Sequence, residues 1–390
     1  MLAVRGGIGI GGALVLAVLL SACTAPTTPE SSPTSSAPTT ESTSSELAAP
    51  TFRLPLGCDD LVSTTDAAEA LRAPATLVTW PSTADHASLD DIAVTAAGGL
   101  VCQWTVEPDN FSPTITTETY PAPRMVVQVL PDAASTWNPG WQDDAEATDT
   151  RDFGTTKAFA SCGDIGCRAN ALVGSNWVQI LIYNPGAQLT TTSLGSPDET
   201  FAHATPAFTS LFDRLASAGE PAPAWTPPTS AKPVASSCDA LLPTDAAATA
   251  LGGDNGDAGD GYVAQEPQKL PSVQTVAVQD IGALGCVYGP VGTSAVIAPL
   301  TITAVPGGAW IAPKILSNIP TGSTQAAVQL TGLPSSDTAI LWCGVNDQQC
   351  QVLFSLNGQG IDVTTNALQD SPVSAHDAAI AAAEAIIARP

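Results

Sequence analysis

The stretch KAFASCGDIGCRANALV, residues 157–173, predicts two β-strands joined by a tight turn. Small and apolar residues lead into Cys162, and a second such run leaves from Cys167. The four residues between the cysteines contain the glycine and aspartate that turns favour. This segment therefore places two cysteines on opposite sides of a β-hairpin.

A second stretch, AILWCGVNDQQCQVLFSL at residues 339–356, has the same arrangement. Working outward from the two hairpins, eight cysteines fall into two sets of four in matching order. The numbers of intervening residues are 43, 59 and 4 in the first set and 47, 56 and 6 in the second. The sets are Cys58, Cys102, Cys162 and Cys167, and Cys238, Cys286, Cys343 and Cys350.

The residues around these cysteines also match. The sequence CDDL at 58–61 corresponds to CDAL at 238–241, and an alanine-rich segment follows each. LVCQW at 100–104 corresponds to LGCVY at 284–288. We therefore predict that the chain contains two copies of one domain.

The copies are expected at residues 51–219 and 234–390, because the proline-rich segment 220–233 between them is typical of a semi-rigid connector. Each copy should begin with a short helix, capped in the first copy by Thr65 or Asp66, and end with a longer helix that has an apolar stripe. The predicted fold class is α+β. Each repeated domain would be an antiparallel β-meander sheet with helices packed on it, stapled by disulfides.

Four cysteines in each copy allow three disulfide pairings. The hairpin pairs, Cys162 with Cys167 and Cys343 with Cys350, can form bonds if their Cβ atoms share a face of the sheet. The other bonds would then be Cys58–Cys102 and Cys238–Cys286, which would tie the first helix to the sheet. The spacing alone leaves the three pairings open.

The N-terminus predicts export. Residues 1–22 contain Arg5 and an apolar run, Ile8–Leu20, that is too short to span a bilayer and has the length of a signal peptide's apolar region. The run ends in LSAC at 20–23, which looks like the lipobox of bacterial lipoproteins. We expect Cys23 to be lipidated and to hold the protein on the membrane. The alternative is an ordinary secretory signal with a stray cysteine.

Residues 23–50 form the predicted tether. They are rich in serine, threonine and proline and contain no aromatic or basic residue. Such a segment cannot bury enough apolar surface to offset its chain entropy, so we expect it to be disordered and extended. Its role would be that of a spacer between membrane and folded domains, with or without O-glycosylation.

The charge balance excludes two classes of binding partner. The 390 residues include 12 Lys and Arg against 37 Asp and Glu, a formal net charge of −25. Nucleic acids and anionic lipid headgroups repel such a chain, so we expect neither nucleic acid nor a bare membrane surface as partner. The predicted membrane contact is the lipid at Cys23 alone.

The motifs resemble those of actinobacterial cell-envelope lipoproteins. The resemblance rests on the lipobox and tether, on Cys-Asp-x-Leu followed by an alanine-rich helix, and on Cys-x-Trp or Cys-x-Tyr before a strand that ends in proline. It implies tandem copies of an uncharacterised cysteine-containing domain, with a cell-envelope address and this fold class. It implies no activity.

Sequence motifs for catalysis or metal binding are missing. The chain has no G-x-S-x-G and no H-E-x-x-H, and its three histidines, His86, His203 and His376, have no histidine or cysteine at ligand spacing. Acidic segments at 143–152 and 254–261 fit no calcium-loop template. We predict no catalytic residue, no metal site and no cofactor.

Tryptophans offer the one hypothesis for a ligand surface. Four of the eight, Trp104, Trp177, Trp310 and Trp342, lie in or beside predicted strands and should belong to the core. Trp137 and Trp141 lie in a predicted loop, where flat rings could stack on a sugar. These two form the candidate ligand-binding pair.

The sequence as a whole predicts a non-catalytic, lipid-anchored protein on the extracytoplasmic face of the cell membrane. It would present two disulfide-stapled domains to an unknown protein partner or envelope component. Two alternatives are a solute-binding lipoprotein of a transporter and an unrecognised extracytoplasmic enzyme. A two-lobed cleft would favour the first, and convergent polar side chains in one pocket would favour the second.

Overall fold

The computed structural model describes the chain from residue 49 onward, within one compact unit, Glu46–Pro390. We refer to residues 49–226 as the first half and to residues 235–389 as the second half. No helix in these described parts is long and apolar enough to cross a membrane. The described ranges are 49–78, 89–106, 123–139, 150–163, 166–183, 194–226, 235–253, 262–265, 272–290, 299–317, 326–344, 347–367 and 372–389.

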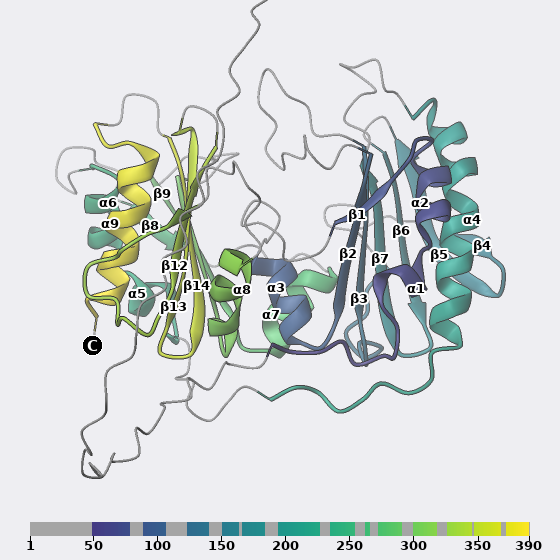
Figure 1. Ribbon diagram of the computed structural model, residues 1–390, viewed down its shortest axis with the longest axis horizontal. Helices are drawn as coiled ribbons and strands as arrows, with labels where there is room; N and C mark the ends of the chain where they lie inside the picture. Colours follow the sequence, from purple (N-terminus) through teal and green to yellow (C-terminus); the bar gives the residue numbers. More distant parts are fainter. Residues whose placement is uncertain are drawn as a thin grey trace, which may run out of the picture. The chain divides into compact units, whose positions relative to one another are not determined.

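The first half contains a seven-stranded antiparallel sheet with the order β1-β2-β3-β7-β6-β5-β4 (Figure 1). Strand β4 pairs with β5, β5 with β6 and β6 with β7, so this part is a meander, as the sequence predicts. The strands are β1 Thr76–Val78, β2 Leu100–Thr105, β3 Arg124–Leu130, β4 Thr150–Phe153, β5 Thr156–Gly163, β6 Gly166–Val173 and β7 Asn176–Tyr183.

The second half contains another seven-stranded antiparallel sheet, with the order β8-β9-β10-β14-β13-β12-β11. Counted along the chain, the strands occupy the same positions in both sheets: first, second, third, seventh, sixth, fifth and fourth. The strands are β8 Tyr262–Gln265, β9 Leu284–Pro290, β10 Leu300–Val305, β11 Ala326–Ala327, β12 Ala339–Cys343, β13 Gln349–Leu356 and β14 Gln359–Asn366.

Three helices cover one face of the first sheet, which we call its outer face: α1 Cys58–Leu61, α2 Thr64–Ala70 and α4 Pro197–Ala216. Alternate strand residues such as Met125 and Val127 meet the apolar stripe of α4 in this core, as the period of two along a strand requires. Ser63, not Thr65 or Asp66, caps α2, since its Oγ accepts from the Asp66 amide at 3.1 Å. The predicted cap was therefore wrong by two or three residues, because a cap must lie just outside the first turn.

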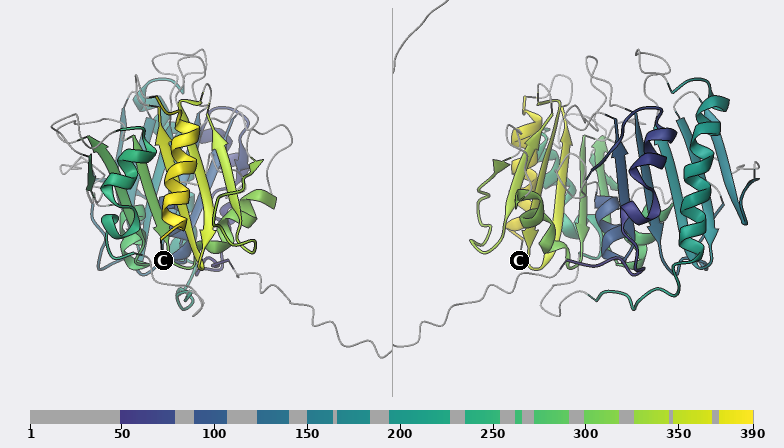
Figure 2. Two further views of the ribbon diagram at one scale, coloured as in Figure 1. Left: turned by 90° about the vertical axis from the view of Figure 1, so that its left-hand side faces the viewer. Right: turned by 45° about the vertical axis from the view of Figure 1, so that its right-hand side comes forward.

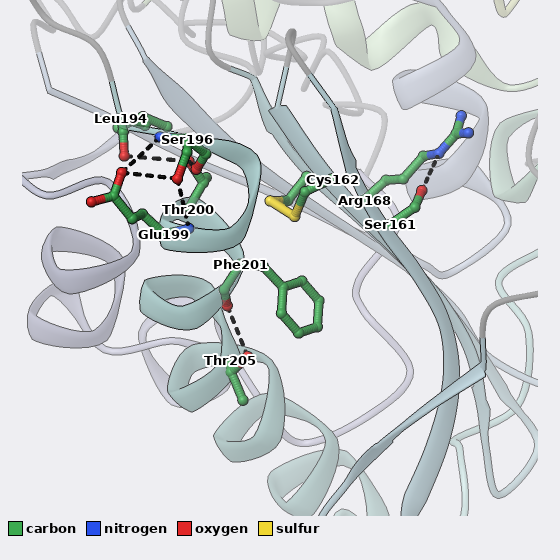
Figure 3. The surroundings of a disulfide bond; sticks show 10 residues. Ser161, Cys162, Arg168, Leu194, Ser196, Glu199, Thr200, Phe201 and Thr205 are labelled. Carbon is green, nitrogen blue, oxygen red and sulfur yellow. Dashed lines mark hydrogen bonds between the residues drawn. A yellow bond between two sulfur atoms is a disulfide. The ribbon is translucent and has the colours of Figure 1, made fainter.

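The long helix α4 begins with a reciprocal cap (Figure 3). The Ser196 amide donates to Glu199 Oε2 at 2.8 Å, and the Glu199 amide donates to Ser196 Oγ at 3.3 Å. The Ser196 backbone and hydroxyl donors hold the pKa of Glu199 below its ordinary value. This capping box fixes where the helix starts against the sheet.

The outer face of the second sheet is covered in the same way by α5 Cys238–Leu241, α6 Thr244–Ala250 and α9 Ala375–Ile387. Figure 2 shows α9, in yellow, lying against the strands. Its buried side chains are mainly alanines, together with Ile386 and Ile387. Small side chains let this helix approach β13 and β14 closely.

Short helices lie between the two sheets, against the faces that we call inner (Figure 1). Helix α3, Leu89–Ala96, contacts β2 and β3 of its own half and β10 of the other, while α7, Val273–Asp280, contacts β3 and β7 of the first half. The two helices also contact each other, and α8, Ile311–Ser317, packs with the turn η4, Gly308–Trp310, on the inner face of the second sheet. Two apolar clusters draw side chains from both halves and join them.

Four disulfides staple the outer cores. Of the three pairings open to each set of cysteines, the structure has the one that combines a hairpin bond with a long-range bond. The bonds are Cys58–Cys102, Cys162–Cys167, Cys238–Cys286 and Cys343–Cys350. Their number is typical of proteins that fold in an oxidising environment outside the cytoplasm.

Candidate functional site

The inner face of the first sheet is unusually polar for a buried surface. Strand residues that alternate with the apolar outer set place three glutamines and an asparagine here, each at most 9% exposed. We call these residues the inner polar face: Gln103 on β2, Gln128 on β3, Asn170 on β6 and Gln179 on β7. Buried amides are costly unless they find hydrogen-bond partners, so each one needs an account.

Asp91 of α3 is a hydrogen-bond acceptor shared by the two halves. Its Oδ1 accepts from Gln128 Nε2 at 2.6 Å and from Gln274 Nε2 of α7 at 2.9 Å. Gln179 makes a second link, because its Oε1 accepts from the Val273 amide at the start of α7, at 3.0 Å. The helix layer is therefore held to the first sheet by directional bonds as well as by apolar packing.

A third network lies near the end of β6. Trp177 Nε1 donates to Asn170 Oδ1 at 2.6 Å, and Asn170 Nδ2 donates to the carbonyls of Asn138 and Pro139 at 2.8 and 3.1 Å. The asparagine thus fixes both the buried indole ring and the segment after Trp137. These bonds hold residues 138 and 139, which directly follow Trp137.

Positive charge gathers at the other end of this face. The guanidinium carbon of Arg124 lies 5.0 Å from the centre of the Tyr183 ring on β7. Burial lowers the pKa of Arg124, while the nearby Tyr183 and Asp91 act in the opposite direction. Arginine stays charged at neutral pH nonetheless.

A second arginine lies on the same face. Arg168 Nε donates to Ser161 Oγ at 3.1 Å, and Figure 3 shows both side chains directed away from the Cys162 disulfide. Burial lowers the pKa of Arg168 as well. Two arginines therefore lie at the end of the inner face formed by β3, β6 and β7, with Asp91 near Arg124, although the whole chain is strongly acidic.

The second sheet carries a buried carboxylate on its inner face. Asp362 of β14 is 8% exposed, and its two oxygens accept from Gln351 Nε2 at 2.9 Å and from Thr364 Oγ1 at 3.3 Å. The rest of this face is mainly apolar, with Trp310, Trp342 and Leu353 in one cluster. The two inner faces thus differ in both charge and polarity.

The predicted ligand-binding pair is described only in part. Trp137 is half-buried, packs against the cluster that contains Trp177 and Leu130, and lies 6.1 Å from the Phe159 ring. It belongs to the first half's inner side. Trp141 and the predicted lipidation site Cys23 lie outside the described residues. The four tryptophans expected in the core, Trp104, Trp177, Trp310 and Trp342, are confirmed as buried.

One group among the described residues has the proximity of a metal site: Cys343, Asp347 and Cys350. The two sulfurs are bonded to each other in a disulfide and have no thiolate to offer a metal. This group is therefore the turn of a stapled hairpin. Of the histidines, His203 lies on α4 and His376 near the start of α9, where its Nδ1 is 2.9 Å from Asp377 Oδ1, while His86 lies outside the described residues.

Sequence reasoning missed the inner polar face. A signal was available, since Gln103 in β2, Arg124 and Gln128 in β3, and Gln179 in β7 interrupt largely apolar strands, each between apolar neighbours or at a strand end. Such alternation usually indicates a solvent-exposed face. Only the position of α3 and α7 shows that this face is covered.

The comparisons with known proteins give no relative. No family model matches the chain, no curated protein matches it, and no solved structure matches it.

Proposed function

We propose that this chain is an exported, lipid-anchored, non-catalytic protein that binds a protein partner or an envelope component through two disulfide-stapled copies of one α+β domain. The observation that carries the proposal is the joining of two stapled sheets through α3 and α7 around a buried polar layer. Bonds from both halves converge on Asp91 in that layer. Such an arrangement suits a rigid recognition module.

Export is supported by the chemistry of the cysteines. Eight of the nine form four disulfides within the folded unit, which leaves Cys23 as the odd cysteine behind an apolar signal. A lone N-terminal cysteine after LSA is what lipidation requires. The anchor and the disulfides therefore support the same compartment.

Duplication is supported by repeated details as well as by the common strand order. At the end of α4, Arg214 Nη1 donates to the Asp60 carbonyl of α1 at 2.9 Å; at the end of α9, Arg389 Nη1 donates to the Asp239 carbonyl of α5 at 2.9 Å. Two residues after the last residue of α3 and of α7 comes a glycine with a left-handed backbone, Gly98 and Gly282 respectively. Similar contacts in both halves, with the arginine's acceptor displaced by one residue along the short helix, favour two copies of one domain.

The alternative, a solute-binding protein of a transporter, would require the two halves to move relative to each other. Such proteins close two lobes around a ligand by hinge movement. Here two apolar clusters and two hydrogen bonds hold the halves together through α3 and α7. The shared layer favours a fixed binding body over a hinged one.

Anchoring is tested by labelling cells with a fatty acid and fractionating them. We expect the wild-type chain to carry label and to sediment with membranes, and the Cys23→Ser variant to lose both properties. Cys162→Ser is the matched control. It replaces a cysteine that is disulfide-bonded in the wild type, and this variant should keep the label. Equal labelling of wild type and Cys23→Ser would contradict the anchor.

Partner binding is tested by co-sedimentation of the exported chain with protein-stripped cell wall at two salt concentrations. We expect no retention at low salt, because the acidic chain and an anionic wall repel each other. Cross-linking on intact cells should then give a discrete protein adduct. Retention on the wall would make the envelope component the ligand. If the chain neither sediments with the wall nor gives a cross-linked adduct on cells, the binding proposal is wrong.

A further inference from the structure

Helices α3 and α7 occupy the same place in the two halves. Each lies before the strand that carries the second cysteine of its half, β2 or β9. Ile92 of α3 and Val276 of α7 are counterparts, since each lies six residues before its half's left-handed glycine, Gly98 or Gly282. Every position on one helix therefore has a counterpart on the other.

Each of these helices packs on the sheet of the opposite half. Helix α3 contacts β10, where Ile92 belongs to the apolar cluster that contains Val305. Helix α7 contacts β3, where Val276 belongs to the cluster that contains Leu130. Val305 and Leu130 are counterparts too, since each ends the third strand of its half and is followed by a proline. Reciprocal packing of this kind is the mark of an isologous interface, which joins two copies of one subunit.

Each half has a core and disulfides of its own. Two of the four disulfides lie within the first half and two within the second. The outer core of each sheet likewise draws its side chains from one half alone. The halves are therefore joined by the connector and by the noncovalent contacts of the helix layer.

The inner faces have apolar surface that a half on its own would expose. Trp177 and Leu130 of the first sheet are at most 1% exposed, and α7 contributes Val273, Val276 and Ala277 to their cluster. Without α7, part of this apolar surface would face water, which is unfavourable. An apolar surface of this kind favours association with a partner that covers it.

Two hydrogen bonds between the halves give the pair an orientation. Gln179 Oε1 accepts from the Val273 amide at 3.0 Å, and Asp91 Oδ1 accepts from Gln274 Nε2 at 2.9 Å. The counterpart of Asp91 in the second half is Thr275, seven residues before Gly282. Two second halves would therefore lack the carboxylate that accepts from Gln274, so this bond favours a first half paired with a second half.

We propose that each half is a pairing domain, whose inner face and inner helix bind another copy of the same domain without need of the connector. The proposal rests on the duplication proposed above and names the partner of the inner surface: a first half binds a second half. The apolar clusters supply the association, and the bonds of Gln179 and Asp91 select the partner and its orientation.

The first test is cleavage of the connector in the full exported chain, purified in nonionic detergent. A specific protease site replaces residues 227–232, and each fragment keeps its own two disulfides after the cut. We expect the two fragments to elute together in size exclusion at the size of the uncut chain, and to separate only in urea. Two folded fragments that elute separately in native buffer would overturn the proposal.

Exchange of fragments tests what the inner surface recognises. A cut chain with a C-terminal affinity tag is mixed in urea with a cut, untagged chain that is isotope-labelled, and the urea is removed. The tagged second half should then recover labelled first half on the affinity resin, as measured by mass spectrometry. If refolded fragments do not pair again, the halves do not recognise each other and the proposal is wrong.

A matched pair of variants locates the interface. Gln274→Glu places a second carboxylate where the wild-type amide donates to Asp91, and like charges at this distance oppose pairing. We expect the affinity between the cut fragments to fall by about tenfold or more. Gln279→Glu is the control, since Gln279 is an exposed residue of the same helix, and it should leave the affinity unchanged. Equal affinities in the two variants would contradict pairing through α7.

The outcomes separate the pairing from the wider proposal. Folded fragments that separate, from a chain that still gives a discrete cross-link on cells when uncut, would remove the pairing and leave the binding function standing. Fragments that stay paired, from a chain that gives neither a cross-link nor wall retention, would support the pairing and remove the binding function. Fragments that unfold on cleavage would show that the halves are not separate domains and would overturn the pairing together with the duplication.

Discussion

The two halves of the molecule have the same strand order and the same disulfide positions, but they differ on the faces that they turn toward each other. On the outer side, Trp104 of one half and Tyr288 of the other occupy the same position beside a disulfide, and both are fully buried. On the inner side, Arg168 corresponds to Gln351 and Asn170 to Leu353, by their registers from Cys167 and Cys350. The outer chemistry repeats and the inner chemistry does not.

This difference separates what builds the fold from what the fold can be used for. Outer positions must fill a core between sheet and helices, so few side chains suit them. Inner side chains must match the helix that packs on them, and these helices differ between the halves. Helices α3 and α7 make hydrogen bonds to the first sheet, whereas α8 packs on the second sheet through apolar side chains. The polar inner face of the first sheet, which the second half does not repeat, is therefore the better candidate for function.

The largest expected effect comes from removing the disulfides, which occur at the same positions in the two halves. Replacing Cys58 and Cys102 by alanine should lower the free energy of unfolding by about 4 kcal/mol, and Cys238 with Cys286 by the same amount, since their loops are 44 and 48 residues long. Replacing the hairpin pair Cys162 and Cys167 should cost about 2 kcal/mol, because its loop is short. Urea denaturation of each variant measures the difference. A hairpin bond worth as much as a long-range one would contradict this chain-entropy account.

The next effect sharpens the contrast between Tyr288 and Trp104. Tyr288 Oη is 2.8 Å from the Cys238 carbonyl and 2.9 Å from the Leu242 carbonyl, whereas Trp104 Nε1 has no partner among the described residues. Tyr288→Phe should therefore destabilise the protein by about 1–3 kcal/mol, since the one hydroxyl proton that the two carbonyls share is lost, although the Cys238 carbonyl keeps the Leu242 amide as a donor. Tyr183→Phe is the control for removing a tyrosine hydroxyl elsewhere.

The same residue predicts a pH dependence. Burial, reinforced by Asp239, raises the pKa of Tyr288 well above its ordinary value near 10. Above about pH 10 the unfolded chain releases this proton and the folded chain keeps it, so stability falls as the pH rises. The slope should be shallower in Tyr288→Phe by up to about 1.4 kcal/mol per pH unit. Identical slopes for the two proteins would argue against the buried hydroxyl.

A smaller effect tests the joint between the halves. Asp91→Asn replaces a charged acceptor of two amide bonds by a neutral one, and we expect a loss of about 1–2 kcal/mol in unfolding free energy. Asp152→Asn, at an exposed ion pair with Lys157, should change it by less than about 0.5 kcal/mol. If Asp91→Asn behaves like Asp152→Asn, the shared carboxylate does not hold the halves together.

The sequence predicts the hairpin strands but not the helices between the two sheets. The hairpins around Cys162 and Cys343 could be predicted because turn residues, apolar runs and cysteines coincide there. Helices α3 and α7 could not, since both are short and are covered on more than one side. Ile92 of α3 packs in one cluster and Ala93 in the other, which removes the single apolar stripe that indicates a helix.

The candidate site was out of reach for a related reason. Gln103, Gln128 and Gln179 alternate with apolar residues as solvent-exposed side chains would, and the sequence does not say which distant helix covers them. The correspondence of Gln103 with Val287 was available from the aligned cysteines. Its meaning depends on the burial of that face, which is a tertiary property.

The smallest effect compares two arginines that do the same thing in each half. Arg214 and Arg389 each donate to the carbonyl of an aspartate in a short helix, and replacing either by alanine should cost about 0.5–1 kcal/mol. Arg214 has in addition Asp66 Oδ2 at 3.6 Å from its Nη2, so Arg214→Ala should cost a few tenths of a kcal/mol more. In about 1 M salt that excess should vanish, because the partly exposed ion pair is screened and the carbonyl bond is not. Parallel denaturation of the two variants at both salt concentrations measures it, and a difference that survives high salt would mean that the two contacts are not equivalent.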